Sequence, residues 1–180
     1  MSDDNKLIVE RKKKLDELSA LTKIYPNSFK RNITTTELID RFETEEKENL
    51  EKIDELFSIT GRLLTIRKMG NSTFANLHDD SGKIQLYLSK NGTRKEMYGL
   101  LDQTDLGDII GASGKIFKTK TGELTLNVSE YIILSKSLRP LPEKYHGLTD
   151  VEIKYRQRYL DLMVSEDSRK VFKDRITIIS

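Results

Sequence analysis

Several residue types that mark whole classes of protein are absent or scarce in this chain of 180 residues. It has no cysteine, which excludes disulfides and thiolate chemistry. Its two histidines, His78 and His146, lie far apart, so no metal site is expected. No apolar run approaches the roughly 18 residues of a membrane span. Because the acidic start also lacks the apolar run of a signal peptide, we expect a cytoplasmic protein.

Charge is abundant but nearly balanced, at a net +2. Residues 1–57 carry 11 basic and 14 acidic side chains, residues 58–137 carry 11 and 8, and residues 138–180 carry 9 and 7. A mildly basic middle is compatible with a nucleic-acid surface, and equally with ordinary surface charge.

The first 55 residues predict a helical extension. Apolar residues at three-to-four spacing predict a helix over residues 6–25, stopped by Pro26. Its basic run, residues 11–14, is either a phosphate contact or a solvated face. Thr34-x-x-Glu37 has the form of a capping box and predicts a second helix. Residues 43–55 form a connector or a weak, charged helix.

From Phe57 the hydrophobic pattern alternates with a period of two, which predicts strands. They are expected over residues 57–64, 73–78, 83–88, 108–118 and 123–134, with a helix over residues 93–103. Three strands, a helix and two strands are typical of an OB-fold, a five-stranded Greek-key barrel. The predicted fold class is therefore mainly β with flanking helices, with the barrel at residues 56–137. An SH3-like barrel and an antiparallel sandwich are the alternatives.

Residues 138–180 predict a linker and further helices. Two prolines stiffen residues 138–142, and Thr149-x-x-Glu152 is a capping box that starts a helix through Met163. Another helix is expected from near Glu166 to Ser180. Its last apolar residues need a partner surface, so we expect that a longer protein continues beyond this point.

No catalytic constellation is found in the sequence. Residues 107–115 superficially resemble a phosphate-binding loop, but the GxxxxGK spacing fails because position 109 is Ile. Gly111 and Gly114 lie within a strand pattern and are predicted to mark bends of the sheet. No nucleophile has a matching base, so no catalytic residue is predicted.

The informative residue is Phe74. If Thr73, Ala75 and Leu77 face the interior of the barrel, then Phe74 faces outward, and the same alternation in the next strand places Gln85 outside. These strands form the face on which OB-folds bind oligonucleotides, helped by a loop that here carries Lys118, Lys120 and Glu123. A ring beside an amide suits one unstacked base. Alternatively, a helix or loop covers Phe74.

Three strings in the sequence resemble one known family. Tyr155-Arg156-Gln157-Arg158-Tyr159-Leu160-Asp161-Leu162 is similar to the segment that enters the catalytic domain of class IIb aminoacyl-tRNA synthetases. The strings at residues 117–124 and 138–148 narrow the resemblance to the lysyl-tRNA synthetases. The resemblance covers the chain from the first helix to the last residue. It implies an N-terminal OB-fold that reads a UUU or CUU anticodon, followed by the start of a class II catalytic domain at residues 138–180.

The resemblance also implies roles for individual residues. Phe74 corresponds to the ring that stacks on the middle uridine, and Gln85 to the amide that bonds that base. Arg67 is the match for a basic residue beside it, and Glu123 for the acid that meets the first anticodon base. The alternative for Glu123 is an ion pair with Lys118 or Lys120. Lys68, Lys118 and Lys120 are possible contacts to the RNA backbone. The family usually has two adjacent basic residues late in the first strand, but here the first position is Ile66.

For the full-length enzymes the resemblance implies ATP and Mg²⁺ as cofactors and a homodimer. Because the ATP-binding motifs are not found in residues 1–180, we expect this chain to be inactive alone and to be a monomer or weak dimer. Three rivals remain: a free-standing OB module for single-stranded nucleic acid or tRNA, an Asp- or Asn-type synthetase, and a scaffold without RNA.

Overall fold

The computed structural model describes residues 3–141 and 150–180. The chain forms two compact units, residues 1–140 and 141–180, and each is described by itself. The predicted boundary at residues 137/138 lies close to this division. The predicted separation of residues 1–55 from the OB-fold remains a prediction. In the described residues, no helix is long and apolar enough to cross a membrane.

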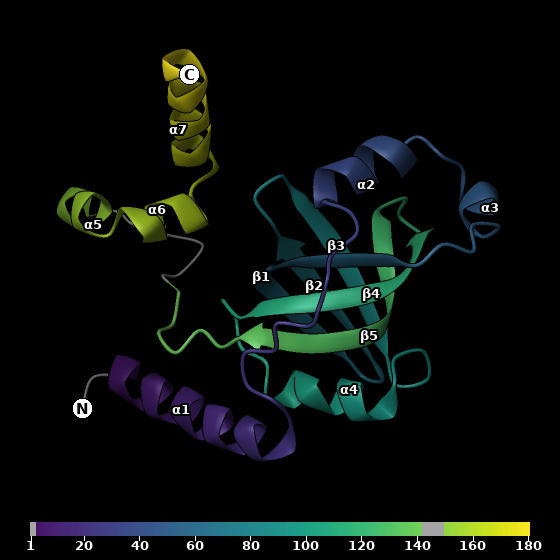
Figure 1. Ribbon diagram of the computed structural model, residues 1–180, viewed down its shortest axis with the longest axis horizontal. Coiled ribbons are helices and arrows are strands. Elements are labelled where there is room, and N and C mark those ends of the chain that lie inside the picture. Colours follow the sequence, from purple (N-terminus) through teal and green to yellow (C-terminus); the bar gives the residue numbers. More distant parts are fainter. Residues whose placement is uncertain (1–2, 142–149) are drawn as a thin grey trace. The chain divides into compact units, whose positions relative to one another are not determined.

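Five strands form a closed sheet in the first unit, in the order β1-β2-β3-β5-β4 (Figure 1). Their bounds are β1 Phe57–Met69, β2 Ser72–His78, β3 Lys83–Ser89, β4 Ile109–Lys118 and β5 Leu124–Ser135. All neighbours are antiparallel except β3 and β5, which pair in parallel, and β1 closes the sheet against β4. The fold class predicted from the sequence is confirmed. β1 is five residues longer than expected, because its pairing with β2 extends to Met69.

Side chains along each strand alternate between the two faces of the closed sheet, and the inward-facing ones fill its interior, as the period of two predicts. Thr73, Ala75 and Leu77 of β2 are buried, whereas Phe74, Asn76 and His78 between them are half-exposed. The core of buried apolar residues also includes Leu63, Ile84, Leu86, Leu88, Ile110, Leu126, Val128 and Ile133.

The two glycines of β4 have different roles. Gly114 lies at a register shift between β4 and β5, where an added Cβ would approach the Asn127 carbonyl oxygen to 2.0 Å. Its interpretation as a bend is confirmed. Gly111 instead lies beneath the Phe29 ring, 2.8 Å from where a Cβ would be. Close packing of the segment before α2 therefore excludes a side chain at Gly111.

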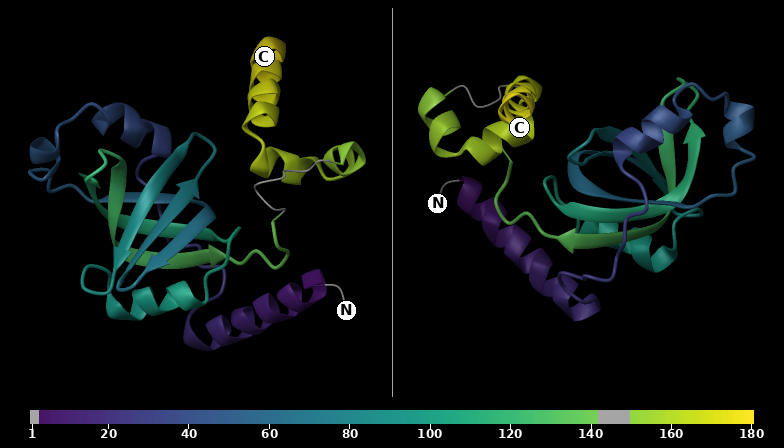
Figure 2. Two further views of the ribbon diagram at one scale, coloured as in Figure 1. Left: turned by 180° about the vertical axis from the view of Figure 1, so that it is seen from behind. Right: turned by 45° about the horizontal axis from the view of Figure 1, so that its top comes forward.

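Short helices flank the closed sheet at both ends (Figures 1 and 2). α2 (Thr35–Phe42) and α3 (Lys47–Leu50) lie at one end, and α4 (Lys95–Gly99) with a 3₁₀ turn (Leu100–Asp102) lies at the other. The predicted capping box is present, because Thr34 and Glu37 exchange hydrogen bonds at the start of α2. The expected helix over residues 93–103 is shorter and divided, since its second half tightens into the 3₁₀ turn.

The first helix, α1 (Asp3–Leu21), ends four residues before the predicted limit. Tyr25 has φ +54°, a left-handed conformation that cannot continue a right-handed helix. Two cations of its basic run bind the rest of the first unit. Arg11 donates to the Ser137 and Arg139 carbonyl oxygens, and Lys14 donates to Asp105 at 2.7 Å. These two residues are therefore structural contacts rather than a free phosphate-binding face.

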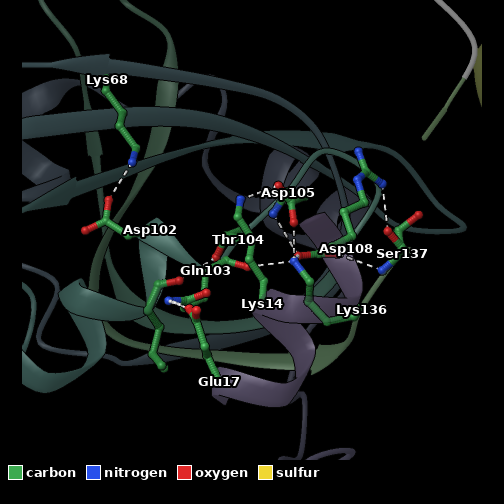
Figure 3. A network of polar contacts seen from close by, with 12 residues as sticks. Lys14, Glu17, Lys68, Asp102, Gln103, Thr104, Asp105, Asp108, Lys136 and Ser137 are labelled. Atoms are coloured by element: carbon green, nitrogen blue, oxygen red, sulfur yellow. Dashed lines mark hydrogen bonds and ion pairs between the residues drawn. The ribbon is translucent and has the colours of Figure 1, made fainter. Parts of the chain in front are cut away.

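Lys136 is the centre of a buried polar network (Figure 3). Its ammonium donates to Asp108 at 2.7 Å, to Asp105 at 2.5 Å and to the Gln103 carbonyl oxygen at 2.6 Å. The side chains of Lys136 and Asp108 are fully buried. Burial acts to raise the pKa of Asp105, but hydrogen bonds from Lys136 and Lys14 outweigh it and lower that pKa. The network joins α1, the loop before β4 and the end of β5.

The second unit contains α5 (Val151–Arg156), α6 (Arg158–Val164) and α7 (Glu166–Ile179). The single helix expected through Met163 is interrupted at Gln157, whose ψ of +55° breaks the helical path. Asp150 caps α5 by accepting from the Glu152 and Ile153 amides. The predicted cap Thr149, His146 and the end of the predicted linker lie outside the described residues. The predicted start of α7 near Glu166 is confirmed, with Ser165 as its cap.

Candidate nucleic-acid interface

Three aromatic rings gather on the outer face of the closed sheet. Phe74 of β2 and Tyr87 of β3 are register partners, with ring centroids 5.0 Å apart. Phe117 of β4 meets Tyr87 edge-on at 5.8 Å. Tyr87 is held by a 3.0 Å hydrogen bond between its hydroxyl and Ser72. The three rings are half-exposed, so they form a partly open apolar surface that can stack an unpaired base. We call it the aromatic row.

Phe74 therefore lies on the outside of the sheet, as its place in the strand predicts. Its principal ring neighbour is Tyr87 of the adjacent strand. Neither α1 nor α2 supplies a ring against it among the aromatic contacts of the described residues. Because the ring is half-exposed, neither a helix nor a loop buries it.

Gln85 and Glu123 are in direct contact beside the aromatic row. Gln85 Nε2 donates to a Glu123 carboxylate oxygen at 2.6 Å, and Gln85 Oε1 accepts from the Thr125 hydroxyl at 3.1 Å. Gln85 was expected outside the barrel, but it is buried, with 7% of it exposed, since it contacts Glu123 and the fully buried Thr125. Glu123 is exposed. The amide is thus held from both sides, with its nitrogen toward the carboxylate.

This contact replaces the expected ion pair of Glu123. Among the described residues, neither Lys118 nor Lys120 pairs with the Glu123 carboxylate. Lys118 instead donates to the Glu43 and Glu45 carbonyl oxygens at 2.7 and 2.6 Å, and so fixes the segment between α2 and α3. Lys120 is exposed in the turn between β4 and β5.

The register of β1 separates its two late basic residues. Arg67 pairs with Phe74, so its exposed side chain lies on the outer face with the aromatic row. Ile66 pairs with Ala75 and packs against the core. Lys68 pairs with Thr73 at the rim, and its ammonium lies 2.7 Å from Asp102, an exposed ion pair (Figure 3). Of these three residues, only Arg67 shares a face with Phe74.

The turn after β2 is fixed to the start of α2 by Asp79. Its carboxylate accepts from the Thr35 amide at 2.9 Å, the Thr35 hydroxyl at 2.6 Å and the Ser81 and Gly82 amides at 2.8 Å. Partial burial acts to raise the pKa of Asp79, but the hydrogen bonds from Thr35, Gly82 and Ser81 outweigh it and lower the pKa to about 2. This ionised cluster anchors the ends of β2 and β3.

Within the described parts of the chain, no group of three or more histidine or acidic side chains could hold a metal ion. The outer face combines stacking rings, an amide, a carboxylate and a guanidinium. These groups can stack a base and bond its edge, but they do not form a nucleophile with its base. The arrangement suits binding of single-stranded nucleic acid.

Comparison with known proteins agrees with this chemistry. Residues 57–134 match the family described as OB-fold nucleic acid binding domain. The chain is 46% identical over 177 residues to a lysine–tRNA ligase of Erwinia tasmaniensis, which covers 98% of this chain and 35% of that protein. The chain is a homologue of lysine–tRNA ligases. The ligase of Dechloromonas aromatica is 43% identical over 178 residues, which covers 99% of this chain and 36% of that protein.

The chain spans about a third of the length of these ligases, and the resemblance inferred from its three strings is confirmed. Sequence reasoning identified Phe74 and Gln85 and placed Tyr87 on the outer face, but it missed Phe117 and Thr125 as parts of the same surface. The outward position of Tyr87 followed from alternation in the strand and is confirmed, since the ring is half-exposed. Thr125 could not be found in this way, because its contact with Gln85 depends on the parallel pairing of β3 with β5.

Proposed function

We propose that this chain binds the anticodon loop of lysine-accepting tRNA through the aromatic row and the adjoining Gln85 and Glu123. The observation that carries the proposal is the half-exposed Phe74–Tyr87 pair beside a hydrogen-bonded amide and carboxylate. A base stacked on such a ring gains about 1–3 kcal/mol. The homology to lysine–tRNA ligases supports tRNA as the nucleic acid.

The proposed reading of the bases follows from their chemistry. Phe74 stacks the middle uridine, and Gln85 donates to one of its carbonyl oxygens. Arg67 lies on the same face and supplies a second donor. Glu123 accepts from N3–H of the first anticodon base where that base is uridine. Lys68 and Lys120 contact phosphates, and Lys118 contributes the donor that it does not use within the protein.

For the longer protein we propose the activity that names its relatives, ATP-dependent attachment of lysine to tRNA in the cytoplasm, with Mg²⁺ and as a homodimer. Residues 1–180 contribute RNA binding, so we propose that alone they bind tRNA without aminoacylating it and form a monomer or weak dimer.

The test is a titration of the chain with a synthetic anticodon stem-loop carrying UUU. Phe74→Leu removes the ring but keeps an apolar side chain against Tyr87, and should weaken binding by about 1–3 kcal/mol. Phe172→Leu in α7 is the matched control and should bind as the unaltered chain does. Phe172 packs with Arg158 in the second unit.

Unchanged affinity of the Phe74→Leu chain would refute stacking. Replacement of the middle uridine by cytidine separates the rival functions. A free-standing OB module for single strands should bind both stem-loops alike, with affinity set by phosphates. An Asp- or Asn-type synthetase should prefer its own anticodon over UUU.

A further inference from the structure

The Gln85 amide has two hydrogen-bond partners, and together they favour one orientation. Its nitrogen donates to Glu123 at 2.6 Å, and its oxygen lies 3.1 Å from the Thr125 hydroxyl. That hydroxyl also lies 3.1 Å from the Glu123 carbonyl oxygen, so its single hydrogen is shared between two acceptors. Rotation of the amide by half a turn would set its oxygen against the Glu123 carboxylate, which is repulsive.

An amide can present either a donor or an acceptor to a base, and only one choice selects uridine. Uridine offers O4 and O2 as acceptors, whereas cytidine has a donor amine at C4. An amide fixed with its nitrogen toward the base edge bonds uridine and opposes the cytidine amine. If the amide were free to turn, its oxygen could accept from that amine and the selectivity would fall. The Glu123 carboxylate opposes such a turn from the side of the amide nitrogen. Selectivity depends further on the group that holds the amide oxygen.

Thr125 is that group. It is fully buried on β5 and is the register partner of Gln85 across the parallel β3–β5 pair. Among the described residues it is the donor to Gln85 Oε1. Gln85 itself is 7% exposed, so without the hydroxyl its oxygen would be left buried and unsatisfied. The side chain would then move to reach water and leave the position from which it meets a base.

We propose that Thr125 is a positioning residue for base recognition, which holds the Gln85 amide with its nitrogen toward Glu123 and the bound base and so favours uridine over cytidine. The proposal rests on the proposed function. It also couples the two bases that Gln85 and Glu123 contact, since one hydrogen bond joins the side chains that read them.

The experiment measures the affinity ratio for UUU and UCU anticodon stem-loops. Thr125→Val keeps the shape of the side chain but removes the hydroxyl, and should lower the ratio about tenfold, because an unsatisfied buried acceptor disfavours the productive orientation. Thr125→Ser restores a hydroxyl and should restore the ratio. In a Gln85→Ala background, Thr125→Val should leave the ratio unchanged, since Thr125 acts through Gln85.

Each outcome decides one point. If the unaltered chain does not prefer UUU, the proposed function fails together with the inference. If the unaltered chain prefers UUU, two results would overturn only the positioning role. In the first, the Thr125→Val chain keeps the same preference for UUU. In the second, Thr125→Val changes the affinity ratio equally in the presence of Gln85 and in the Gln85→Ala background. If the Thr125→Val chain does not fold, Thr125→Ala takes its place in the comparison with the Gln85→Ala background. If neither variant folds, the positioning role is overturned and Thr125 has a purely structural role.

Discussion

Removal of the Lys136 ammonium should strongly destabilise the first unit. The ammonium is fully buried and donates to three acceptors, of which the Asp108 carboxylate is also fully buried. Lys136→Met keeps most of the aliphatic volume but leaves that carboxylate without its counter-ion. Breaking a buried ion pair from one side costs about 3–5 kcal/mol. Amides of Asp105 and Ser137 still donate to Asp108, so we expect about 3 kcal/mol.

The assay is urea unfolding followed by far-ultraviolet circular dichroism. Lys68→Met is the matched control, because its ion pair with Asp102 is exposed and of equal length, 2.7 Å. Exposed pairs contribute about 1 kcal/mol or less. The double change Lys136→Met with Asp108→Asn removes both charges and should recover part of the loss. Equal losses of free energy of unfolding for Lys136→Met and Lys68→Met would refute the assignment of this network as a buried anchor.

Three further predictions concern the ends of the sheet and its charge. Asp79→Asn should lower the free energy of unfolding by about 1–2 kcal/mol near neutral pH, after allowance for solvent screening. The folded pKa of Asp79 is lowered to about 2 from 3.8, so its contribution is present above the ordinary value and is lost as pH falls through about 2. The free energies of unfolding of the unaltered and Asp79→Asn chains should therefore converge in acid. A difference that stays constant with pH would contradict this role of Asp79. Thr34→Ala removes the cap of α2 and should cost about 1 kcal/mol in thermal unfolding, while Thr44→Ala, which caps no helix, serves as the control. If Lys68, Lys118 and Lys120 each neutralise one phosphate, a plot of the logarithm of the stem-loop affinity against the logarithm of the salt concentration should have a slope of about −2. A slope twice as steep would place further cations in the interface.

The closed sheet could be predicted from the sequence because the pattern that identifies each strand lies within a few consecutive residues. Alternation with a period of two fixes which side of each strand is buried, and it placed Phe74 outside and Leu77 inside correctly. The Thr34–Glu37 box is equally local, since both partners lie within one turn. Features of this kind depend on residues that are close in sequence, so they can be predicted without knowledge of the fold.

The remaining features depend on partners that are distant in sequence. Gln85 meets Glu123 and Thr125 across a parallel strand pair that periodicity does not reveal. Lys118 donates to the carbonyl oxygens of residues 43 and 45, contacts that the sequence did not reveal. Likewise, the basic run of α1 looked like a solvated or phosphate-binding face, while Arg11 and Lys14 bind within the first unit.

The central claim, that RNA bases lie on the outer face of β2 and β3, is tested most directly by mapping the contact on the protein. Nuclear magnetic resonance spectra of the ¹⁵N-labelled chain would be recorded during addition of the UUU anticodon stem-loop. We predict that the largest amide shifts fall at Arg67, Phe74, Gln85, Tyr87 and Glu123, and diminish when the middle uridine is replaced by cytidine. Shifts confined to the exposed lysines of α1 or to α5–α7, with β2 and β3 unmoved, would contradict the account.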